Sequence, residues 1–373
     1  MTSISDPTRP ARLLDRPFTL GDLTVRNRIV MAPMTRRFSP GGVPGEDVAA
    51  YYARRAAGGA GLIVTEGTYV GRAAAAAYDG VPRFHGADAL AGWARVAEEV
   101  HRAGGRIMPQ LWHVGVRRPA DSPPAGVLAE GPSGVDLDGR PYGTAMSGQD
   151  IDAVAGAFAE AAAAAERTGF DGVELHGAHG YLIDDFLWAD TNRRTDAYGG
   201  DHASRARFAA EIVAAVRAAV SPGFPVVLRL SQWKVDHYDA RIAETPAELE
   251  ALLTPLAAAG VDAFHASTRR YWLPEFEGSD LNLAGWTRKL TGKAAITVGS
   301  VGLDKEFRGS QDQAQQVGTT GIDLLLDRLE RDEFDLVAVG RALVSDPDWP
   351  RKAIGDRLGE AIPYDAALLS TLV

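Results

Sequence analysis

Residues 173–181 read Val-Glu-Leu-His-Gly-Ala-His-Gly-Tyr, an apolar run that ends in two histidines, small residues and a tyrosine. An Ala-rich segment typical of a helix, from about Ile151 to Arg167, comes before this stretch. The run Gly172–Leu175 therefore predicts a strand, with His176 and His179 just beyond its carboxyl end. Because the carboxyl ends of strands carry the functional side chains in parallel α/β proteins, a site is expected here.

Short β-rich runs alternate with Ala-rich amphipathic segments along the chain, at a spacing of roughly 30 to 50 residues. A doubly wound open sheet is the competing α/β architecture, but no G-x-G-x-x-G motif follows the first strand. Eight regular units also exceed what one such sheet usually needs, so the pattern predicts an α/β protein with a single (β/α)8 TIM barrel. The expected strands are Ile29–Met34, Gly61–Glu66, Arg106–Leu111, Gly172–Leu175, Pro225–Leu230, Val261–His265, Ala294–Val298 and Asp335–Val339.

The predicted barrel forms one domain over residues 17–373, and residues 1–16 are expected to be a flexible N-terminal segment. Residues 18–25 alternate around Gly21-Asp22 and predict a hairpin that plugs the N-terminal mouth of the barrel. Residues 114–146, rich in proline and glycine, form a long loop after the third strand. A loop of this length inside a compact domain indicates a lid or a binding element.

The composition narrows the classes of partner. The chain has 373 residues, a net charge of −10 and no cysteine. This negative charge argues against nucleic acid and anionic membranes as partners, and it favours a protein that acts on soluble small molecules. The absence of cysteine excludes disulfides, thiolate nucleophiles and iron–sulfur sites. No apolar run reaches the roughly 18 residues of a membrane span, and no signal sequence is evident, so we expect a cytoplasmic protein.

The residues expected at the carboxyl ends of the strands combine a permanent cation, an amide, hydroxyl groups, imidazoles, an aromatic ring and glycine turns. This mixture suits a flat heteroaromatic cofactor that carries a phosphate. Glycine turns after strands seven and eight of a barrel commonly hold phosphate on backbone N–H groups, and Arg341 adds a bidentate donor. The residues are Met34, Thr35, Gly67, Gln110, Trp112, His176, His179, Arg229, Ser267, Gly299, Ser300, Gly340 and Arg341.

Arg229 stands in a strand of Val and Leu, where an unpaired guanidinium is costly, and a bound anion would explain it. Two other interpretations of the histidines are open. His176 and His179 are compatible with structural roles, bonded to backbone carbonyls. Their H-x-x-H spacing, with Glu174 or Asp184 as a carboxylate ligand, is also compatible with zinc in a barrel hydrolase, although Arg229 would repel a dication.

Five spaced motifs resemble the old yellow enzyme family of FMN-dependent ene-reductases. They occur in the order that the family shows, and the resemblance runs from about Phe18 to Leu358. The motifs are Asn-Arg-Ile-Val-Met-Ala-Pro-Met-Thr at 27–35, Gln-Leu-Trp-His at 110–113, Glu-Leu-His-Gly-Ala-His-Gly-Tyr-Leu at 174–182, Asn-Arg-Arg-Thr-Asp-Ala-Tyr-Gly-Gly at 192–200 and Val-Gly-Arg-Ala at 339–342.

The resemblance implies FMN at the carboxyl face of the barrel, with NAD(P)H as co-substrate. Arg229 would lie near the N1/O2 edge of the flavin, where a cation stabilises the anionic reduced form. Gln110 would bond the pyrimidine edge, and Thr35 would reach the O4/N5 edge. The ring would be lined by Ala32, Pro33, Met34 and Gly67, and the phosphate would be held by Gly299, Ser300, Gly340 and Arg341.

The resemblance also implies the chemistry on the substrate. His176 and His179 would hold the electron-withdrawing oxygen of an activated alkene, such as an enone, enal, maleimide or nitroalkene. Tyr181 would donate a proton to the α-carbon. Trp112 is a further expected member of the substrate site. The alternative to this ene-reductase is a non-catalytic FMN-binding barrel, which would need neither Tyr181 nor the histidine pair.

The chain departs from the family in its combination of residues. Many members have asparagine where His179 stands, whereas others pair two histidines but have cysteine in place of Thr35. Redox tuning by a thiol is therefore excluded. The segment 301–320 resembles an extra loop near the nicotinamide or substrate side, and we expect it to contact ligand only weakly. A homo-oligomer is also compatible with the sequence.

Overall fold

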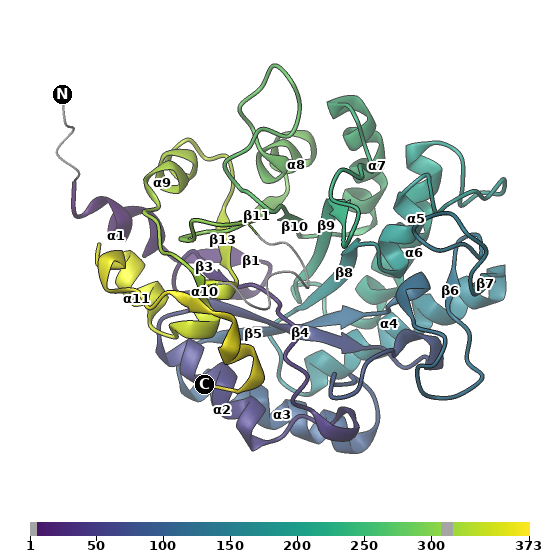
Figure 1. Cartoon of the computed structure of the whole chain (residues 1–373), viewed down its shortest axis with the longest axis horizontal. Helices are drawn as coiled ribbons and strands as arrows, with labels where there is room; N and C mark the ends of the chain where they lie inside the picture. Colours follow the sequence, from purple (N-terminus) through teal and green to yellow (C-terminus); the bar gives the residue numbers. More distant parts are fainter. Residues whose placement is uncertain (1–5, 307–315) are drawn as a thin grey trace.

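The computed structural model describes residues 6–306 and 316–373. Eight parallel strands close a barrel, and helices surround it in Figure 1, which confirms the predicted (β/α)8 architecture. Going round the barrel, the strands are β3 (Ile29–Met31), β4 (Leu62–Tyr69), β5 (Arg106–Trp112), β8 (Val173–His179), β9 (Val226–Lys234), β10 (Ala263–Ser267), β11 (Ala294–Val298) and β13 (Leu336–Val339).

Helices follow the strands because amphipathic Ala-rich segments bury their apolar stripe against the outer face of the sheet. Each fully buried Leu or Phe in this layer contributes roughly 1.5–3 kcal/mol. Among the described residues, no helix combines the length and apolarity needed to cross a membrane. The helices are α2 (Glu46–Ala57), α3 (Ala87–Arg102), α4 (Gly148–Arg167), α5 (Leu182–Leu187), α6 (His202–Ala219), α7 (Pro246–Ala259), α8 (Leu283–Thr291), α9 (Asp323–Glu330), α10 (Arg341–Ser345) and α11 (Trp349–Ile354).

Two strand boundaries differ from the prediction in a way that matters for the site. Strand β8 does not end at Leu175, so the expectation that His176 and His179 lie beyond the strand is wrong. Parallel pairing with β9 continues, with His176 opposite Arg229 and His179 opposite Lys234. The polar residues of this stretch do not end the strand, because the neighbouring strand also extends past its predicted end.

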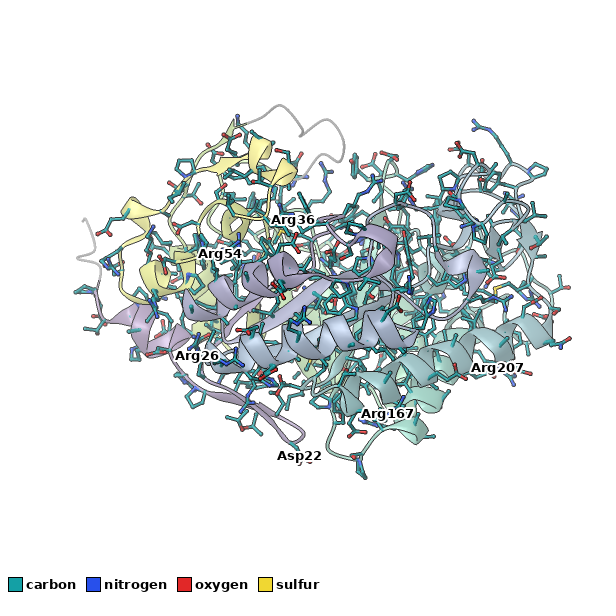
Figure 2. The ribbon with its side chains drawn as sticks, turned by 90° about the horizontal axis from the view of Figure 1, so that it is seen from below. Asp22, Arg26, Arg36, Arg54, Arg167 and Arg207 are labelled. Atoms are coloured by element: carbon teal, nitrogen blue, oxygen red, sulfur yellow. The ribbon has the colours of Figure 1, made fainter. Side chains whose placement is uncertain are left out.

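The predicted N-terminal hairpin is present, as β1 (Phe18–Leu20) and β2 (Leu23–Val25). Leu23 and Val25 are buried against inward-facing barrel residues such as Met108, so the hairpin closes the amino end of the barrel. The backbone N–H of Asp22 donates to the carbonyl oxygen of Gly223 at 2.8 Å, which fixes the tip; Figure 2 shows Asp22 at the edge of the molecule.

Part of the N-terminal segment forms a helix. Residues 9–14 form helix α1 (Arg9–Leu14), whereas residues 1–5 lie outside the described part of the chain. Leu13 and Leu14 are buried, and Arg9 pairs with Asp327 at 2.6 Å and with Glu330 at 2.9 Å. The apolar face and the arginine of α1 thus both have partners on the barrel.

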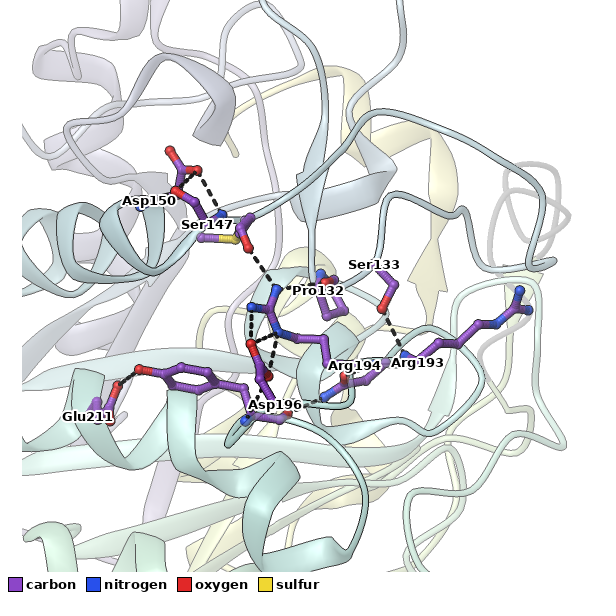
Figure 3. Close-up of polar contacts among 11 residues, drawn as sticks. Pro132, Ser133, Ser147, Asp150, Arg193, Arg194, Asp196 and Glu211 are labelled. Atoms are coloured by element: carbon purple, nitrogen blue, oxygen red, sulfur yellow. Dashed lines mark hydrogen bonds and ion pairs between the residues drawn. The ribbon is translucent and has the colours of Figure 1, made fainter.

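The long loop 114–146 is tied to the segment that follows α5, as Figure 3 shows. Arg194 donates to the carbonyl oxygens of Pro132 at 2.9 Å and Met146 at 2.7 Å, and it pairs with Asp196. The backbone N–H of Arg193 donates to Ser133 Oγ at 2.8 Å. The loop contains the short strands β6 (Glu130–Gly131) and β7 (Thr144–Ala145). Of the other loop singled out from the sequence, 301–320, residues 307–315 lie outside the described residues.

Candidate active site

A cavity of about 500 Å³ opens at the carboxyl end of the barrel strands. Its size lies within the range of roughly 300–1000 Å³ that small-molecule sites occupy. A cavity of about 340 Å³ beside the hairpin, at the other end of the barrel, contains none of the predicted residues. Every residue that the sequence assigns to the site lines the first cavity: Ala32, Pro33, Met34, Thr35, Gly67, Gln110, Trp112, His176, His179, Tyr181, Arg229, Gly299, Ser300, Gly340 and Arg341.

The two histidines of β8 meet edge to face, with ring centres 5.3 Å apart. His179 Nε2 lies 2.8 Å from Ser267 Oγ, and the backbone N–H of His179 donates to Ser231 Oγ at 3.0 Å. His176 Nδ1 is buried and has no hydrogen-bond partner within the described ranges. His179 has φ of 68°, a left-handed conformation that is uncommon for a residue other than glycine and turns its ring into the cavity wall.

Both imidazoles are neutral at physiological pH. Burial lowers the pKa of His176 well below its usual value, and the charge of Arg229 lowers it further. Burial and Arg229 act in the same direction on the pKa of His179. Each neutral ring keeps one N–H donor and one acceptor nitrogen. The pair can therefore offer N–H donors to an oxygen atom without carrying a charge.

Arg229 on β9 is 7% exposed and lies opposite His176. Its Nη2 donates to Ser267 Oγ at 3.3 Å, but its Nε is buried without a partner among the described residues. Burial lowers the pKa of Arg229, and the nearby Glu174 opposes that effect. A buried guanidinium with an unused donor is costly, so the site is built for an additional acceptor, as an anionic or electron-rich ligand would supply.

Glu174 is a fully buried carboxylate that contacts Gln110, a residue of the cavity wall. Gln110 Nε2 donates to one of its oxygens at 2.7 Å, and His265 Nδ1 lies 2.7 Å from the other. Burial alone would raise the pKa of Glu174, but His265, Arg229 and Gln110 together lower it. The carboxylate therefore stays ionised, and it fixes the orientation of the Gln110 amide at the cavity surface.

Tyr181 is the N-cap residue of α5 and stands two residues after His179. Its ring meets His176 at 4.9 Å and Trp112 at 4.8 Å, both edge to face. Burial raises the pKa of Tyr181 to about 12. Gly67 is required beside this cluster, because a Cβ there would lie 2.6 Å from Cε3 of Trp112. The phenol, the indole and one imidazole thus form a compact aromatic wall.

The opposite end of the cavity carries glycine turns and a cation. Gly299 has φ of 148°, and a Cβ there would approach Thr268 Oγ1 to 2.5 Å, so no other residue fits. Arg341 Nη2 donates to Ser300 Oγ at 3.1 Å and to the carbonyl oxygen of Lys305 at 2.7 Å. At Gly340 an added Cβ would be in ordinary van der Waals contact, 3.6 Å from the sulfur atom of Met34. This end suits a phosphate.

The zinc interpretation has no ligand set to support it. Within residues 6–306 and 316–373, no three His, Asp or Glu side chains converge as metal ligands would. Asp184 is instead paired with Lys234 at 3.0 Å, with both side chains fully buried.

Comparison with known proteins agrees with this geometry. The model of the NADH:flavin oxidoreductase / NADH oxidase family matches residues 14–358. The chain belongs to this family, the old yellow enzyme family. It is 31% identical over 351 residues to 12-oxophytodienoate reductase 7 of Oryza sativa subsp. japonica, covering 89% of this chain and 85% of that protein. Morphinone reductase in complex with tetrahydroNAD superposes with a TM-score of 0.80 at 31% identity, covering 95% of this chain and 93% of that one.

A longer relative, an NADH oxidase of Thermoanaerobacter brockii, is 33% identical over 353 residues, which are 91% of this chain. The chain spans 50% of the length of that protein. As a member of the old yellow enzyme family, the protein is an enzyme, an FMN-containing flavin oxidoreductase with NAD(P)H as co-substrate. The cavity fits FMN: a buried cation with an unused donor lies at one end, and glycine turns with an arginine lie at the other.

Several residues of this flavin oxidoreductase site were missed by sequence analysis. Trp233 and Val235 reach the cavity because β9 extends beyond its predicted end at Leu230. Tyr364 and Leu369 come from the segment after the last barrel helix, and no local sequence pattern indicates that this segment folds back over the site. The further lining residues are Thr268, Arg269, Val298, Val301, Leu303 and Val344, together with Ser267, which the sequence analysis had placed at a strand end.

Proposed function

We propose that the protein is an ene-reductase, which takes a hydride from NAD(P)H and reduces the C=C bond of activated alkenes such as enones, enals, maleimides and nitroalkenes. The observation that carries the proposal is the convergence of His176, His179 and Tyr181 on one wall of the FMN cavity, with ring centres within 5.3 Å for each neighbouring pair. A barrel that only bound FMN would need none of these three side chains. The reductases among the relatives support the same class of reaction.

The cofactor supplies the two-electron hydride transfer, and this chain supplies the groups that hold it. Arg229 would be the cation for the N1/O2 edge, since its unused Nε needs an acceptor. Gln110 presents an amide that Glu174 has already oriented. Thr35 would bond the O4/N5 edge, while Ala32, Pro33, Met34 and Gly67 line the ring. Gly299, Ser300, Gly340 and Arg341 would bind the phosphate.

The histidine pair holds the oxygen of the substrate. As hydride reaches the β-carbon, negative charge develops on the carbonyl or nitro oxygen, and two N–H donors stabilise it there. Removing one such donor typically costs about 10²-fold or more in rate. Neutral imidazoles suit this role, and the lowered pKa values keep both rings uncharged. They can therefore donate N–H groups to the uncharged oxygen of the substrate before the hydride arrives.

Tyr181 is the proton donor for the α-carbon. A phenol whose pKa is about 12 is fully protonated at neutral pH and is still far more acidic than the carbon it protonates. Trp112 holds the ring in place through its edge-to-face contact. Such general acids contribute about 10²- to 10⁴-fold to rate.

The test is a single anaerobic experiment on the purified protein loaded with FMN. Visible flavin bands should bleach when NADH or NADPH is added and should return when 2-cyclohexenone or a maleimide follows. If the bands bleach but no activated alkene restores them, the FMN-binding barrel without alkene reduction is the better description, and the proposal fails.

A further inference from the structure

Arg117 lies beside the phenol of Tyr181. It ends the 3₁₀ turn Gly115–Arg117, directly after β5, and its guanidinium carbon is 5.7 Å from the ring centre of Tyr181. The same arginine donates from Nη1 to the carbonyl oxygen of Val235 at 3.1 Å. It therefore spans two loops at the edge of the cavity, one after β5 and one after β9. This position places a positive charge next to Tyr181, the proton donor of the proposed reaction.

Two acidic side chains act on Arg117: the exposed Asp236, and the buried Asp185, whose pKa burial raises well above its usual value and Arg117 lowers. The one ion-pair partner of Arg117 in the described residues is Asp236, at 3.5 Å, and that side chain is 65% exposed, so water screens the pair. Nε of Arg117 is buried and has no hydrogen-bond partner in the described part of the chain. The cation thus retains its charge and one unused N–H donor beside Tyr181.

We propose that Arg117 is a positioning residue for proton transfer, which stabilises the Tyr181 phenolate formed when the phenol protonates the substrate. The inference rests on the proposed ene-reductase function. In that step the Tyr181 O–H bond breaks and a C–H bond forms at the α-carbon, while the hydride forms the C–H bond at the β-carbon. The C=C π bond is lost, and the phenolate takes its proton back from water.

The electrostatics of Tyr181 support this role. Burial makes its phenolate expensive and raises the pKa of Tyr181 to about 12, and the strongest opposing influence is Arg117, which lowers that pKa. The other ionisable groups that act on Tyr181 are the phenols of Tyr78 and Tyr69, which raise its pKa. Among the described residues, Arg117 is thus the charge that most favours the product of proton donation.

The neighbouring Arg118 holds its loop together, so the two arginines have different roles and Arg117 can be substituted separately. Arg118 is buried and donates to three carbonyl oxygens of its own loop, including Ser122 at 2.8 Å and Val127 at 3.2 Å. Its substitution would unfold the loop. Arg117, with a side chain 20% exposed, can be changed with less risk to the fold.

The test measures the two half-reactions separately by stopped-flow on the FMN-loaded enzyme, with R117Q, R117K and the control R140Q. Arg140 lies in the same long loop, 73% exposed and away from the cavity. R117Q should slow flavin reoxidation by saturating 2-cyclohexenone about tenfold, the effect of roughly one pKa unit on the donor. It should leave flavin reduction by NAD(P)H and the dissociation constant of the alkene unchanged. R117K, which keeps the charge, should recover most of the rate.

A double-mutant cycle with Y181F separates this role from a structural one. Once the phenol is absent, R117Q should change the reoxidation rate less than about twofold, and it should no longer alter the solvent deuterium isotope effect. The inference is overturned if R117Q slows both half-reactions equally, or if it costs the same factor in the Y181F background. A wild-type flavin that no enone reoxidises would overturn the proposed function itself, whereas a reoxidised wild type with an unaffected R117Q overturns only this inference.

Discussion

The indole of Trp233 packs against the imidazole of His179, with ring centres 4.3 Å apart and ring planes tilted by 31°. Both side chains are held by the same residue of β10. Trp233 Nε1 donates to the carbonyl oxygen of Ser267 at 3.1 Å, and His179 Nε2 lies 2.8 Å from Ser267 Oγ. The tryptophan therefore sets the direction in which His179 presents its ring to the cavity.

Replacing Trp233 with alanine should loosen His179 and weaken substrate binding. An aromatic contact of this kind contributes about 0.5–1.5 kcal/mol, so we expect the affinity for a phenol or an enone to fall up to roughly tenfold. FMN content should remain unchanged, because Trp233 lies on the substrate side of the proposed site. Ligand titration of the oxidised flavin spectrum measures both quantities, and loss of FMN in W233A would show that the indole supports the cofactor instead.

Replacing both His176 and His179 with alanine should abolish the oxyanion site. We expect binding of phenols and enones to weaken by about 10²-fold or more, because both N–H donors are lost. FMN should stay bound, since Arg229 and the glycine turns are untouched. Spectral titration with a phenol is the measurement. An unaltered titration in H176A/H179A would show that the substrate oxygen is held elsewhere.

Replacing Tyr181 with phenylalanine should separate the two half-reactions. Alkene reduction should slow by about 10²-fold or more, the usual size of a general-acid contribution, while flavin reduction by NAD(P)H stays nearly intact. The ring itself is retained, so its packing on Trp112 is preserved and any loss reports the hydroxyl group. Equal losses in both half-reactions of Y181F would contradict the role of Tyr181 as proton donor.

The sequence predicts the barrel because strands covered on both faces read as apolar runs, as at Ala294–Val298, where prediction and structure coincide. The sequence predicts the end of a strand less well where pairing with a neighbouring strand, and not hydrophobicity, decides where the strand ends. The run Ser231-Gln-Trp-Lys234 is polar, and it stays in β9 because β8 and the turn at His237 pair with it. Trp233 was missed for that reason, and Tyr364 because only tertiary packing brings it to the cavity.

Glu66 provides a prediction for stability against pH. It lies in the middle of β4, 1% exposed, and accepts the backbone N–H groups of Arg36 at 2.8 Å and Arg37 at 3.0 Å. These residues follow Thr35, so Glu66 shapes the turn that lines the cofactor cavity. Burial raises the pKa of Glu66 from its ordinary value of 4.5 to about 7, against the lowering effect of the two N–H groups.

The raised pKa means that the folded protein holds a proton on Glu66 that the unfolded chain has already released between pH 4.5 and 7. Stability from this group is therefore present at low pH and is lost as the pH rises through 7. A difference of 2.5 pKa units (7 − 4.5) corresponds to roughly 3 kcal/mol. E66Q cannot ionise and keeps an acceptor for the turn. We expect its stability relative to the wild type to increase by about 2–3 kcal/mol between pH 5 and 8.

Urea denaturation of the FMN-saturated proteins at both pH values measures this change. The matched control is E98Q on α3, where the side chain is 68% exposed and should show no such pH dependence. If E66Q and the wild type lose stability in parallel from pH 5 to 8, then Glu66 is already ionised at pH 5, with the two backbone N–H groups outweighing burial.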